Sequence, residues 1–324
     1  MQTSIRRGTI VMIVVALIVP LLAACGGQPA AQPQGSEPAG TITASGAFAL
    51  YPLMVRWGEE YSKLHPAVKF DISAGGAGKG MTDALGGQVD LGMVSRSIKP
   101  EEEQQGAYWV SVVKDAVFPA INAKNPVLSD LLVKGVTHDQ MVDVFLTGKI
   151  KTWGELVGRP EIKDEIHVYT RSDSAGAADA WAKFLGKAQE DLKGIGVFGD
   201  PGLMDAVVKD PLGIGYNNLG YAYDPTTGQQ VAGSVVLPLD VNKNGKADAD
   251  EVYDTKAKAV QGVATGKYPS PPARALNVVT KNKPTGLVQD FILWTLTDGQ
   301  KFVENAGYVA LPQDALDKSL QKIK

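Results

Sequence analysis

The sequence is poor in the residues that build covalent cross-links and soft-metal sites, with one cysteine, Cys25, and three histidines in 324 residues. A single cysteine excludes an intramolecular disulfide framework and a zinc site made of several thiolates. The histidines at positions 65, 138 and 167 are too far apart for a ligand spacing such as H-x₃-H. Positive charge is not in excess either, because 32 Lys and Arg face 35 Asp and Glu. A nucleic-acid partner is therefore not expected, since binding to phosphate backbones needs a basic surface.

The N-terminal segment has the features of an export signal followed by a linker. Arg6 and Arg7 precede an apolar run over residues 10–24. The run is shorter than the roughly 20 residues of a comfortable membrane span, so it predicts a secretory signal peptide at residues 1–24. Residues 25–40 are rich in Gly, Pro, Gln and Ala, and this composition predicts a flexible tether.

The residues around Cys25 read Leu22-Ala23-Ala24-Cys25 and resemble the lipobox of bacterial lipoproteins. The resemblance implies cleavage before Cys25, a lipid on its sulfur, and an extracytoplasmic protein anchored to a bacterial membrane, in the periplasm or on the outer face of the cell. The alternative is a buried core cysteine near an ordinary cleavage site. Loss of residues 1–24 removes two arginines and no acid, which changes the formal charge from −3 to −5.

The remainder of the chain alternates predicted strands and helices, which is typical of an α/β fold with mostly parallel sheets. Ligands in such folds bind at the carboxyl ends of strands. Two extended segments, 116–121 and 270–274, are candidate crossings between lobes. We therefore expect a two-lobed fold, with lobe I at 41–118 plus 275–324, lobe II at 119–274, and a cleft and hinge between them. Predicted strands lie at 41–44, 68–73, 90–95, 166–170, 213–216, 237–239 and 278–280, and predicted helices at 52–64, 79–85, 177–185 and 287–296.

Three turns between a predicted strand and a predicted helix consist almost entirely of small residues. Small residues let a ligand approach the backbone N–H groups, and a helix N-terminus directs partial positive charge at it. Together with nearby cations, the turns predict an oxyanion site, whereas the alternative is tight strand–helix packing with no ligand. The turns are 46–49, 75–78 and 174–177, and the cations are Lys79, Arg96 and Arg171.

Two catalytic interpretations fail on the residues present. Gly78-Lys79 suggests a phosphate-binding ATPase loop, but Ser73 replaces its first glycine and Gly80 replaces the Ser or Thr that holds magnesium. A phosphoester hydrolase needs a nucleophile–base pair or a cluster of metal-binding carboxylates, and the sequence presents neither pattern. We therefore expect a binding protein without catalysis.

Seven segments resemble the periplasmic phosphate-binding proteins, the PstS-like substrate-binding subunits of phosphate ABC transporters. Together they extend over most of residues 41–312. The resemblance implies a two-lobed fold of the periplasmic-binding-protein type. Such a fold is a clamp that captures an oxyanion, most simply phosphate, and delivers it to ABC permease subunits in the membrane. The segments are 45–53, 73–81, 94–97, 170–177, 199–216, 267–274 and 297–300.

The resemblance also assigns roles to individual residues. Arg171 matches the family's anion-pairing arginine, Asp173 matches the acid that orients it, and Gly176 and Leu50 match backbone N–H donors. Four alanines stand where phosphate binders commonly have Ser or Thr, and Arg96 stands where several have a proton-accepting Asp, so the anion's identity stays open. The predicted anion-binding residues are Ala49, Leu50, Ala77, Gly78, Lys79, Ser95, Arg96, Arg171, Asp173, Ala175, Gly176 and Ala177.

Residues 240–251 fit the twelve-residue calcium loop of an EF-hand. Oxygen-bearing side chains stand at positions 1, 3, 5, 9 and 12, position 7 offers a backbone carbonyl, and Gly245 fills position 6. The motif predicts a lone structural Ca²⁺ site, and the alternative is a polar surface turn. The predicted ligands are Asp240, Asn242, Asn244, Lys246 through its carbonyl, Asp248 and Glu251.

These observations predict a lipid-anchored solute-binding protein that captures an inorganic oxyanion for an ABC importer. A membrane-tethered oxyanion sensor that presents its bound state to a signalling receptor is the alternative, and the residues do not separate the two.

Overall fold

The computed structural model describes residues 38–324. The predicted signal peptide, Cys25 and residues 25–37 of the predicted tether lie outside the described residues, so these assignments stay predictions.

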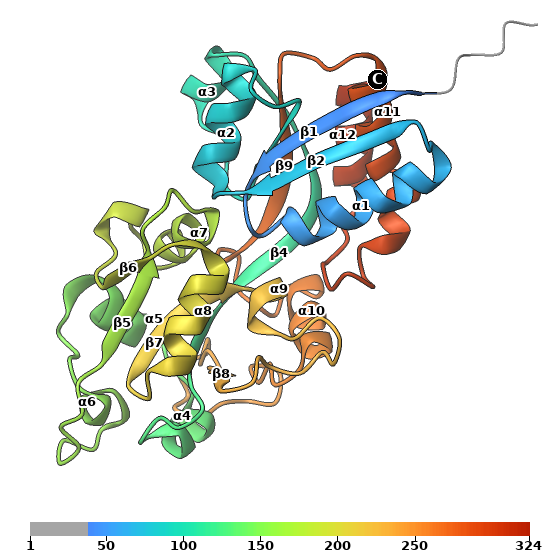
Figure 1. The fold of residues 1–324 in the computed structure, drawn as a ribbon. Coiled ribbons are helices and arrows are strands. Elements are labelled where there is room, and N and C mark those ends of the chain that lie inside the picture. Colours follow the sequence, from blue (N-terminus) through green and yellow to red (C-terminus); the bar gives the residue numbers. More distant parts are fainter. Residues whose placement is uncertain (1–37) are drawn as a thin grey trace, which may run out of the picture. The chain divides into compact units, whose positions relative to one another are not determined.

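The strands form one continuous path in the order β2-β1-β3-β9-β4-β7-β5-β6, and β8 pairs with β4 (Figure 1). Pairing is parallel among β1, β2 and β3 and among β5, β6 and β7, whereas β4 and β9 pair antiparallel to their neighbours. The predicted α/β class is confirmed, with antiparallel strands joining two parallel groups. The strands are β1 (Gly40–Gly46), β2 (Val68–Ala74), β3 (Leu91–Val94), β4 (Ala107–Asn122), β5 (His167–Arg171), β6 (Ile195–Val197), β7 (Gly213–Asn218), β8 (Ser234–Val236) and β9 (Ala273–Lys281).

Strand β4 belongs to both parts of this arrangement. It pairs with β9 as far as Ala116 and with β7 from Val117 onward, so it changes partner between these residues. Residues 115–122 of β4 are buried without alternation, as expected for a strand that is covered on both faces.

Buried side chains form two hydrophobic cores, which define two halves of the described chain. The first half, residues 42–113 and 276–323, contributes one core. The second half, residues 116–273, contributes the other together with Val309. The predicted division at residues 118 and 274 stays a prediction, because a core shows where side chains pack and not where a domain ends.

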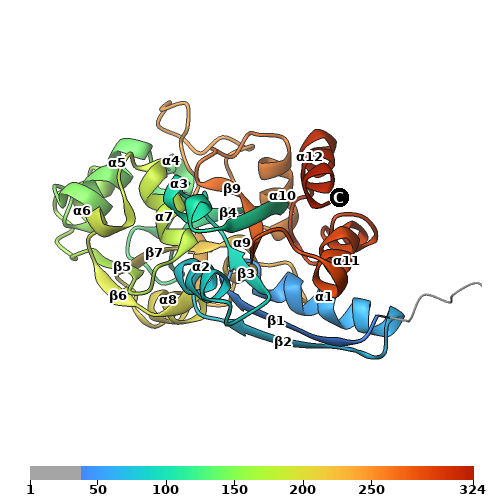
Figure 2. The ribbon, with the colours of Figure 1, turned by 90° about the horizontal axis from the view of Figure 1, so that it is seen from above.

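Helices cover both faces of the strands in each half. In the first half, α1, α11 and α12 lie on one face and α2 and α3 on the other, while in the second half α8 lies opposite α4, α5 and α7 (Figures 1 and 2). No helix within residues 38–324 is long and apolar enough to cross a membrane. The helices are α1 (Tyr51–Leu64), α2 (Ala77–Gly86), α3 (Pro100–Gln104), α4 (Leu128–Lys134), α5 (His138–Val142), α6 (Trp153–Val157), α7 (Gly176–Phe184), α8 (Gly199–Lys209), α9 (Leu219–Ala222), α10 (Lys256–Ala264), α11 (Gly286–Thr295) and α12 (Gln313–Ile323).

One predicted strand is wrong. The strand expected at residues 237–239 is absent, because β8 ends at Val236 and Leu239 makes only an isolated bridge to Val136. Pro238 has no N–H to donate, which interrupts the ladder at this point.

Candidate functional site

The loops that follow the strands of the two halves meet directly. The loop after β2, together with the first turn of α2, contacts the loop between β5 and α7. Here the N–H of Gly78, the second residue of α2, donates to the carbonyl of Ser174 at 2.9 Å. Both loops follow the carboxyl end of a parallel strand, which is where α/β folds place ligands. The third predicted turn joins them, because the N–H groups of Gly75 and Gly76 donate to the carbonyl of Gly46 at 2.8 and 3.0 Å. The structure thus brings all three predicted glycine-rich turns together.

Glycine fits this junction because groups of the opposite half lie too close to its Cα for a side chain. A Cβ atom on Gly76 would lie 2.5 Å from a carboxylate oxygen of Asp173. On Gly78 it would lie 2.4 Å from the hydroxyl of Ser174, and on Gly176 it would lie 2.1 Å from the hydroxyl of Ser95. The predicted residues Ser95 and Gly176 therefore lie against each other across the junction.

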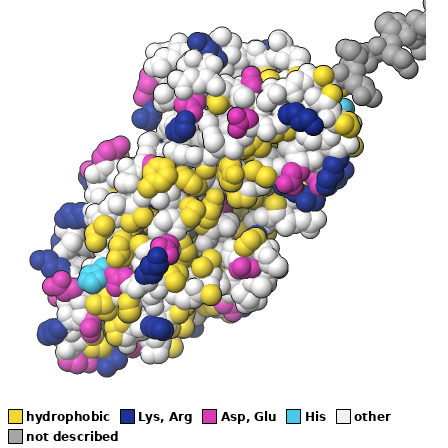
Figure 3. Space-filling view, viewed as in Figure 1, with side chains coloured by type: hydrophobic (Ala, Val, Ile, Leu, Met, Phe, Trp, Pro, Cys, Tyr) yellow, Lys and Arg dark blue, Asp and Glu magenta, His cyan; other side chains and the backbone are white. Residues whose placement is uncertain are grey.

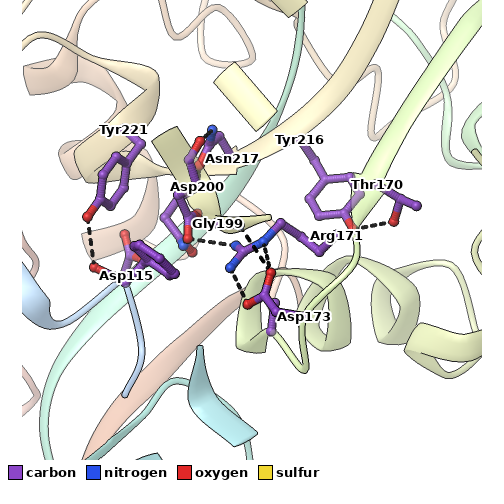
Figure 4. Close-up of polar contacts among 12 residues, drawn as sticks. Asp115, Thr170, Arg171, Asp173, Gly199, Asp200, Tyr216, Asn217 and Tyr221 are labelled. Carbon is purple, nitrogen blue, oxygen red and sulfur yellow. Dashed lines mark hydrogen bonds and ion pairs between the residues drawn. The ribbon is translucent and has the colours of Figure 1, made fainter. Parts of the chain in front are cut away.

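Arg171, the last residue of β5, is the buried cation at this junction. Its side chain is 2% exposed. Nε and Nη2 donate to the two carboxylate oxygens of Asp173 at 2.8 and 2.6 Å, and Nη1 donates to Asp200 at 2.6 Å (Figure 4). Asp173 also accepts the N–H of Gly199 at 3.1 Å. This arrangement fixes the plane of the guanidinium. The part that the family resemblance assigns to Asp173 in anion binding stays a prediction.

The guanidinium retains donor capacity. It carries five N–H bonds, of which three reach the two carboxylates, so one N–H on each Nη has no acceptor within residues 38–324. Burial alone would lower the pKa of Arg171, but the charges of Asp200 and Asp173 outweigh burial and raise that pKa above its ordinary value. The group is therefore a permanent cation with two N–H donors available to an oxyanion.

Aromatic side chains cover the face of this guanidinium. The Cζ of Arg171 lies 5.3 Å from the ring centroid of Phe48, which comes from the loop after β1 in the first half. Phe48 in turn packs edge-on against Phe198 and Tyr221 of the second half, with centroids 5.9 and 6.5 Å apart. Phe198 is 61% exposed, and hydrophobic side chains gather across the middle of the face shown in Figure 3.

Two predicted cations bond to acids of their own half instead. The ammonium of Lys79 pairs with Asp83, one helical turn further along α2, and its side chain is half-exposed. Arg96 forms a two-pronged pair with Glu102 at 2.9 and 2.6 Å. Arg171 is consequently the member of the predicted trio whose guanidinium lies at the contact between the halves.

Some of the predicted backbone N–H donors already have an acceptor within the protein, and others do not. The N–H of Leu50 bonds to the carbonyl of Ala47 at 3.1 Å, and the N–H of Ala175 bonds to the side chain of Gln189 at 3.1 Å. In the described chain the N–H groups of Ala77, Gly176 and Ala177, at the starts of α2 and α7, have no acceptor. Ala49 is buried, and its carbonyl accepts the hydroxyl of Tyr308 at 2.7 Å.

The sequence profile described as the PBP superfamily domain matches residues 31–299, which is most of the chain. The chain belongs to the PBP superfamily.

Relatives of this PBP-superfamily protein are named for phosphate. The phosphate-binding protein PstS of Bacillus subtilis is 27% identical over 315 residues, which cover 94% of each chain. A crystal structure of a putative phosphate ABC transporter substrate-binding protein from Clostridium perfringens, with bound phosphate, matches with a TM-score of 0.68 and 25% identity. It covers 84% of this chain and 100% of the other.

A structure of an ABC-type phosphate transport receptor from Vibrio cholerae matches with a TM-score of 0.59 and 20% identity, again over 84% of this chain and all of the other. These similarities confirm the predicted two-lobed fold and the predicted resemblance to PstS-like proteins.

Hydrogen bonds from its own side chains hold the predicted calcium loop of this PBP-superfamily protein in its conformation. Asp240 is 2% exposed, and its two oxygens accept the N–H groups of Asn244 and Gly245 at 3.1 and 2.9 Å. The amide nitrogens of Asn242 and Asn244 both donate to Asp248, at 2.8 and 2.7 Å. Positions 3, 5 and 9 of the loop thus face one another. Calcium coordination would require both amides to turn their oxygens inward.

Acidic side chains alone do not provide enough ligands for a calcium ion in this loop. Nowhere in residues 38–324 do three His, Cys, Asp or Glu side chains gather in a way that could hold a metal ion. The calcium assignment therefore depends on amide and carbonyl oxygens as much as on Asp240 and Glu251, and it stays a prediction.

Removal of calcium should lower the melting temperature if the loop binds the ion. For a dissociation constant near the weak, extracellular end of such loops, about 10⁻⁴–10⁻³ M, several millimolar Ca²⁺ stabilises by roughly 1–2 kcal/mol. A protein of this size should then melt about 2–6 °C lower in EDTA than in calcium. Calorimetric melting of the wild type and of Asp240→Asn checks this, because the variant should lose the response. Equal melting temperatures of the wild type in calcium and in EDTA would refute the metal site.

Proposed function

We propose that this protein is an extracytoplasmic solute-binding protein that captures an inorganic oxyanion, most simply phosphate, for an ABC importer. The observation that carries the proposal is Arg171, a buried guanidinium held by Asp173 and Asp200 at the contact between the two halves, with two N–H donors to spare. The names of the PstS relatives support phosphate as the anion.

The proposed mode of binding is local and does not depend on the charge of the whole protein. The formal charge is −3 for the full sequence and −5 after loss of residues 1–24, so it gives no long-range attraction for an anion. The partial positive charge at the starts of α2 and α7, with the N–H groups of Ala77, Gly176 and Ala177, would supplement Arg171. We assign no catalytic step to this site.

The proposal includes anchoring by a lipid on Cys25, which the lipobox-like residues 22–25 support. It also includes recognition of the anion-bound form by the importer's membrane subunits. Uptake of radiolabelled phosphate by a deletion strain, complemented with wild-type or Arg171→Lys protein, separates the two roles. An import role predicts that uptake depends on the wild-type protein, whereas a sensing role predicts that uptake does not need it.

Titration calorimetry with phosphate, arsenate, sulfate and molybdate tests the binding step on protein freed of lipid. We expect heat with phosphate and arsenate. We also expect sulfate to compete more closely than in binders that have a proton-accepting Asp, because the corresponding residue here, Arg96, is a cation that cannot accept a proton from phosphate. Absence of heat with all four anions would refute the proposed function.

A further inference from the structure

Arg274 bonds to residues of both halves at the place where the chain passes between them. It is the second residue of β9, and its Nε donates to the carbonyl of Ser95, after β3, at 3.2 Å. Nη1 donates to Asp115 of β4 at 3.1 Å, and Nη2 donates to the side-chain oxygen of Asn218 at the end of β7. One guanidinium therefore ties a first-half loop to a second-half strand.

The strand register places these bonds on either side of the crossing. Asp115 lies directly opposite Arg274 in the β4–β9 ladder. Asn218 lies opposite Val117, after β4 has changed partner at Ala116 and Val117. The bond between Arg274 and Asn218 therefore spans the crossing, whereas the bond between Arg274 and Asp115 stays on one side of it.

From Asn218 the bonds continue to the proposed anion site. The amide nitrogen of Asn218 donates to one oxygen of Asp200, whose other oxygen accepts Nη1 of Arg171 at 2.6 Å (Figure 4 shows the part from Asp200 onward). Asn218 is 2% exposed and Asp200 is 1% exposed, so water does not compete well for these bonds. Direct hydrogen bonds thus link Ser95 to Arg171 through Arg274, Asn218 and Asp200.

The charges of this network do not balance. It contains two cations, Arg171 and Arg274, and three carboxylates, Asp115, Asp173 and Asp200. Asp115 is 1% exposed and its Oδ1 has no hydrogen-bond partner in the described chain. Burial raises the pKa of Asp115 to about 6, even though the charge of Arg274 lowers it. Arg274 is therefore the cation that stabilises the charged form of the buried Asp115 carboxylate.

Access to Arg171 requires the halves to separate, because its side chain is 2% exposed and Gly176 lies against Ser95 with no space for even a methyl group. We propose that Arg274 is a positioning residue that latches the closed form, by holding Asn218 across the crossing and so keeping Asp200 and Arg171 in place. The latch itself does not depend on which ligand binds, whereas its effect on anion affinity rests on the proposed function.

The Gly78 N–H offers a readout of closure. Gly78 is the second residue of α2, so its N–H has no helical acceptor and bonds instead to Ser174 of the other half. Its hydrogen exchange, measured by mass spectrometry or NMR, reports the contact between the halves with or without an anion.

Two variants test the latch. Arg274→Lys keeps a cation beside Asp115 but loses the fork that reaches Ser95 and Asn218 together. The double variant Arg274→Gln with Asp115→Asn removes one charge of each sign and leaves no carboxyl without a cation. Arg159→Gln, an exposed arginine paired with Asp130 and Glu161, is the matched control.

We expect both test variants to speed exchange of the Gly78 amide at least tenfold without added anion, and to weaken phosphate binding about tenfold, mainly through faster dissociation. The control should match the wild type. Wild-type exchange of Gly78 in both test variants, even with lower melting temperatures, would mean that Arg274 is only structural and would overturn the proposal. If the wild-type protein gives no heat with any oxyanion, the proposed function fails, and the exchange data alone still decide whether Arg274 is a latch.

Discussion

Replacement of Arg171 by lysine should weaken phosphate binding by at least about 100-fold. A hydrogen bond to a charged group contributes about 1.5–3 kcal/mol, and each 1.4 kcal/mol is a factor of ten. Lysine keeps the positive charge, but it cannot bond to Asp173 with two parallel N–H groups, reach Asp200 and still offer two donors to an anion. Titration calorimetry with phosphate on both proteins measures the difference.

Folding must be checked separately in this experiment, because Arg171 also neutralises two carboxylates that are almost completely buried. Loss of one partner of a buried ion pair costs about 3–5 kcal/mol, and lysine restores only part of that. Circular dichroism should show a cooperative transition at a lower temperature. Arg159→Lys, at an exposed pair, should leave affinity unchanged. A folded Arg171→Lys protein that binds phosphate within threefold of the wild type would place the anion elsewhere.

Replacement of Gly176 by alanine should prevent the halves from coming together and reduce phosphate affinity by about 100-fold. The added methyl group would lie 2.1 Å from the hydroxyl of Ser95 and 2.5 Å from its carbonyl oxygen. Rotation could move the hydroxyl aside, but the carbonyl is held by Arg274. If the closed form is reduced to about 1% of the population, the apparent affinity for phosphate falls about 100-fold.

The fold itself should tolerate this change. Gly176 begins α7 and does not have a positive φ, so alanine fits its backbone conformation. Gly86→Ala, at the end of α2, is the matched control and should bind normally, because its added methyl group would lie no closer than 3.7 Å to a neighbouring atom, the Cγ of Gln88. Small-angle scattering, with Gly78 exchange as a second measurement, should show a more open Gly176→Ala protein. A compact variant with wild-type affinity would contradict the close contact between Gly176 and Ser95.

The elements of the fold were largely predictable because their signals are local. Alternation of strands and helices in the first half follows from apolar periodicity and from punctuation by glycine and Pro52, and α1 runs from Tyr51 to Leu64 as expected to within a residue. The antiparallel roles of β4 and β9 were not predictable from such patterns. They depend on pairing between residues about 160 positions apart, such as Asp115 and Arg274.

The candidate site was only partly predictable for the same reason. Arg171 and Asp173 are two residues apart and belong to a recognisable motif, whereas Asp200, Arg274 and Asp115 meet Arg171 or one another only through the fold. Segments 199–216 and 267–274 resemble the family, but nothing in their sequence distinguishes a residue of the hydrogen-bond network from a residue of a turn.

Two predicted cations illustrate the opposite case, in which a local signal was available. Lys79 and Asp83 are four residues apart on one helix, a spacing at which opposite charges pair. Arg96 precedes the three acids that begin α3 and pairs with the second of them, Glu102. Phe48 gave no such signal, because its contact with Arg171 joins residues more than a hundred positions apart.

The chain segments that contribute to each core constrain the order in which the two cores can fold during synthesis. Synthesis proceeds from the N-terminus, and the second core takes nearly all its side chains from one continuous stretch, residues 116–273. The first core combines residues 42–113 with residues 276–323, so its N-terminal strands must wait for the last part of the chain to be synthesised. The second core can therefore form in a nascent chain before the first core, whose N-terminal strands lack their full set of partners until residues 276–323 have been synthesised.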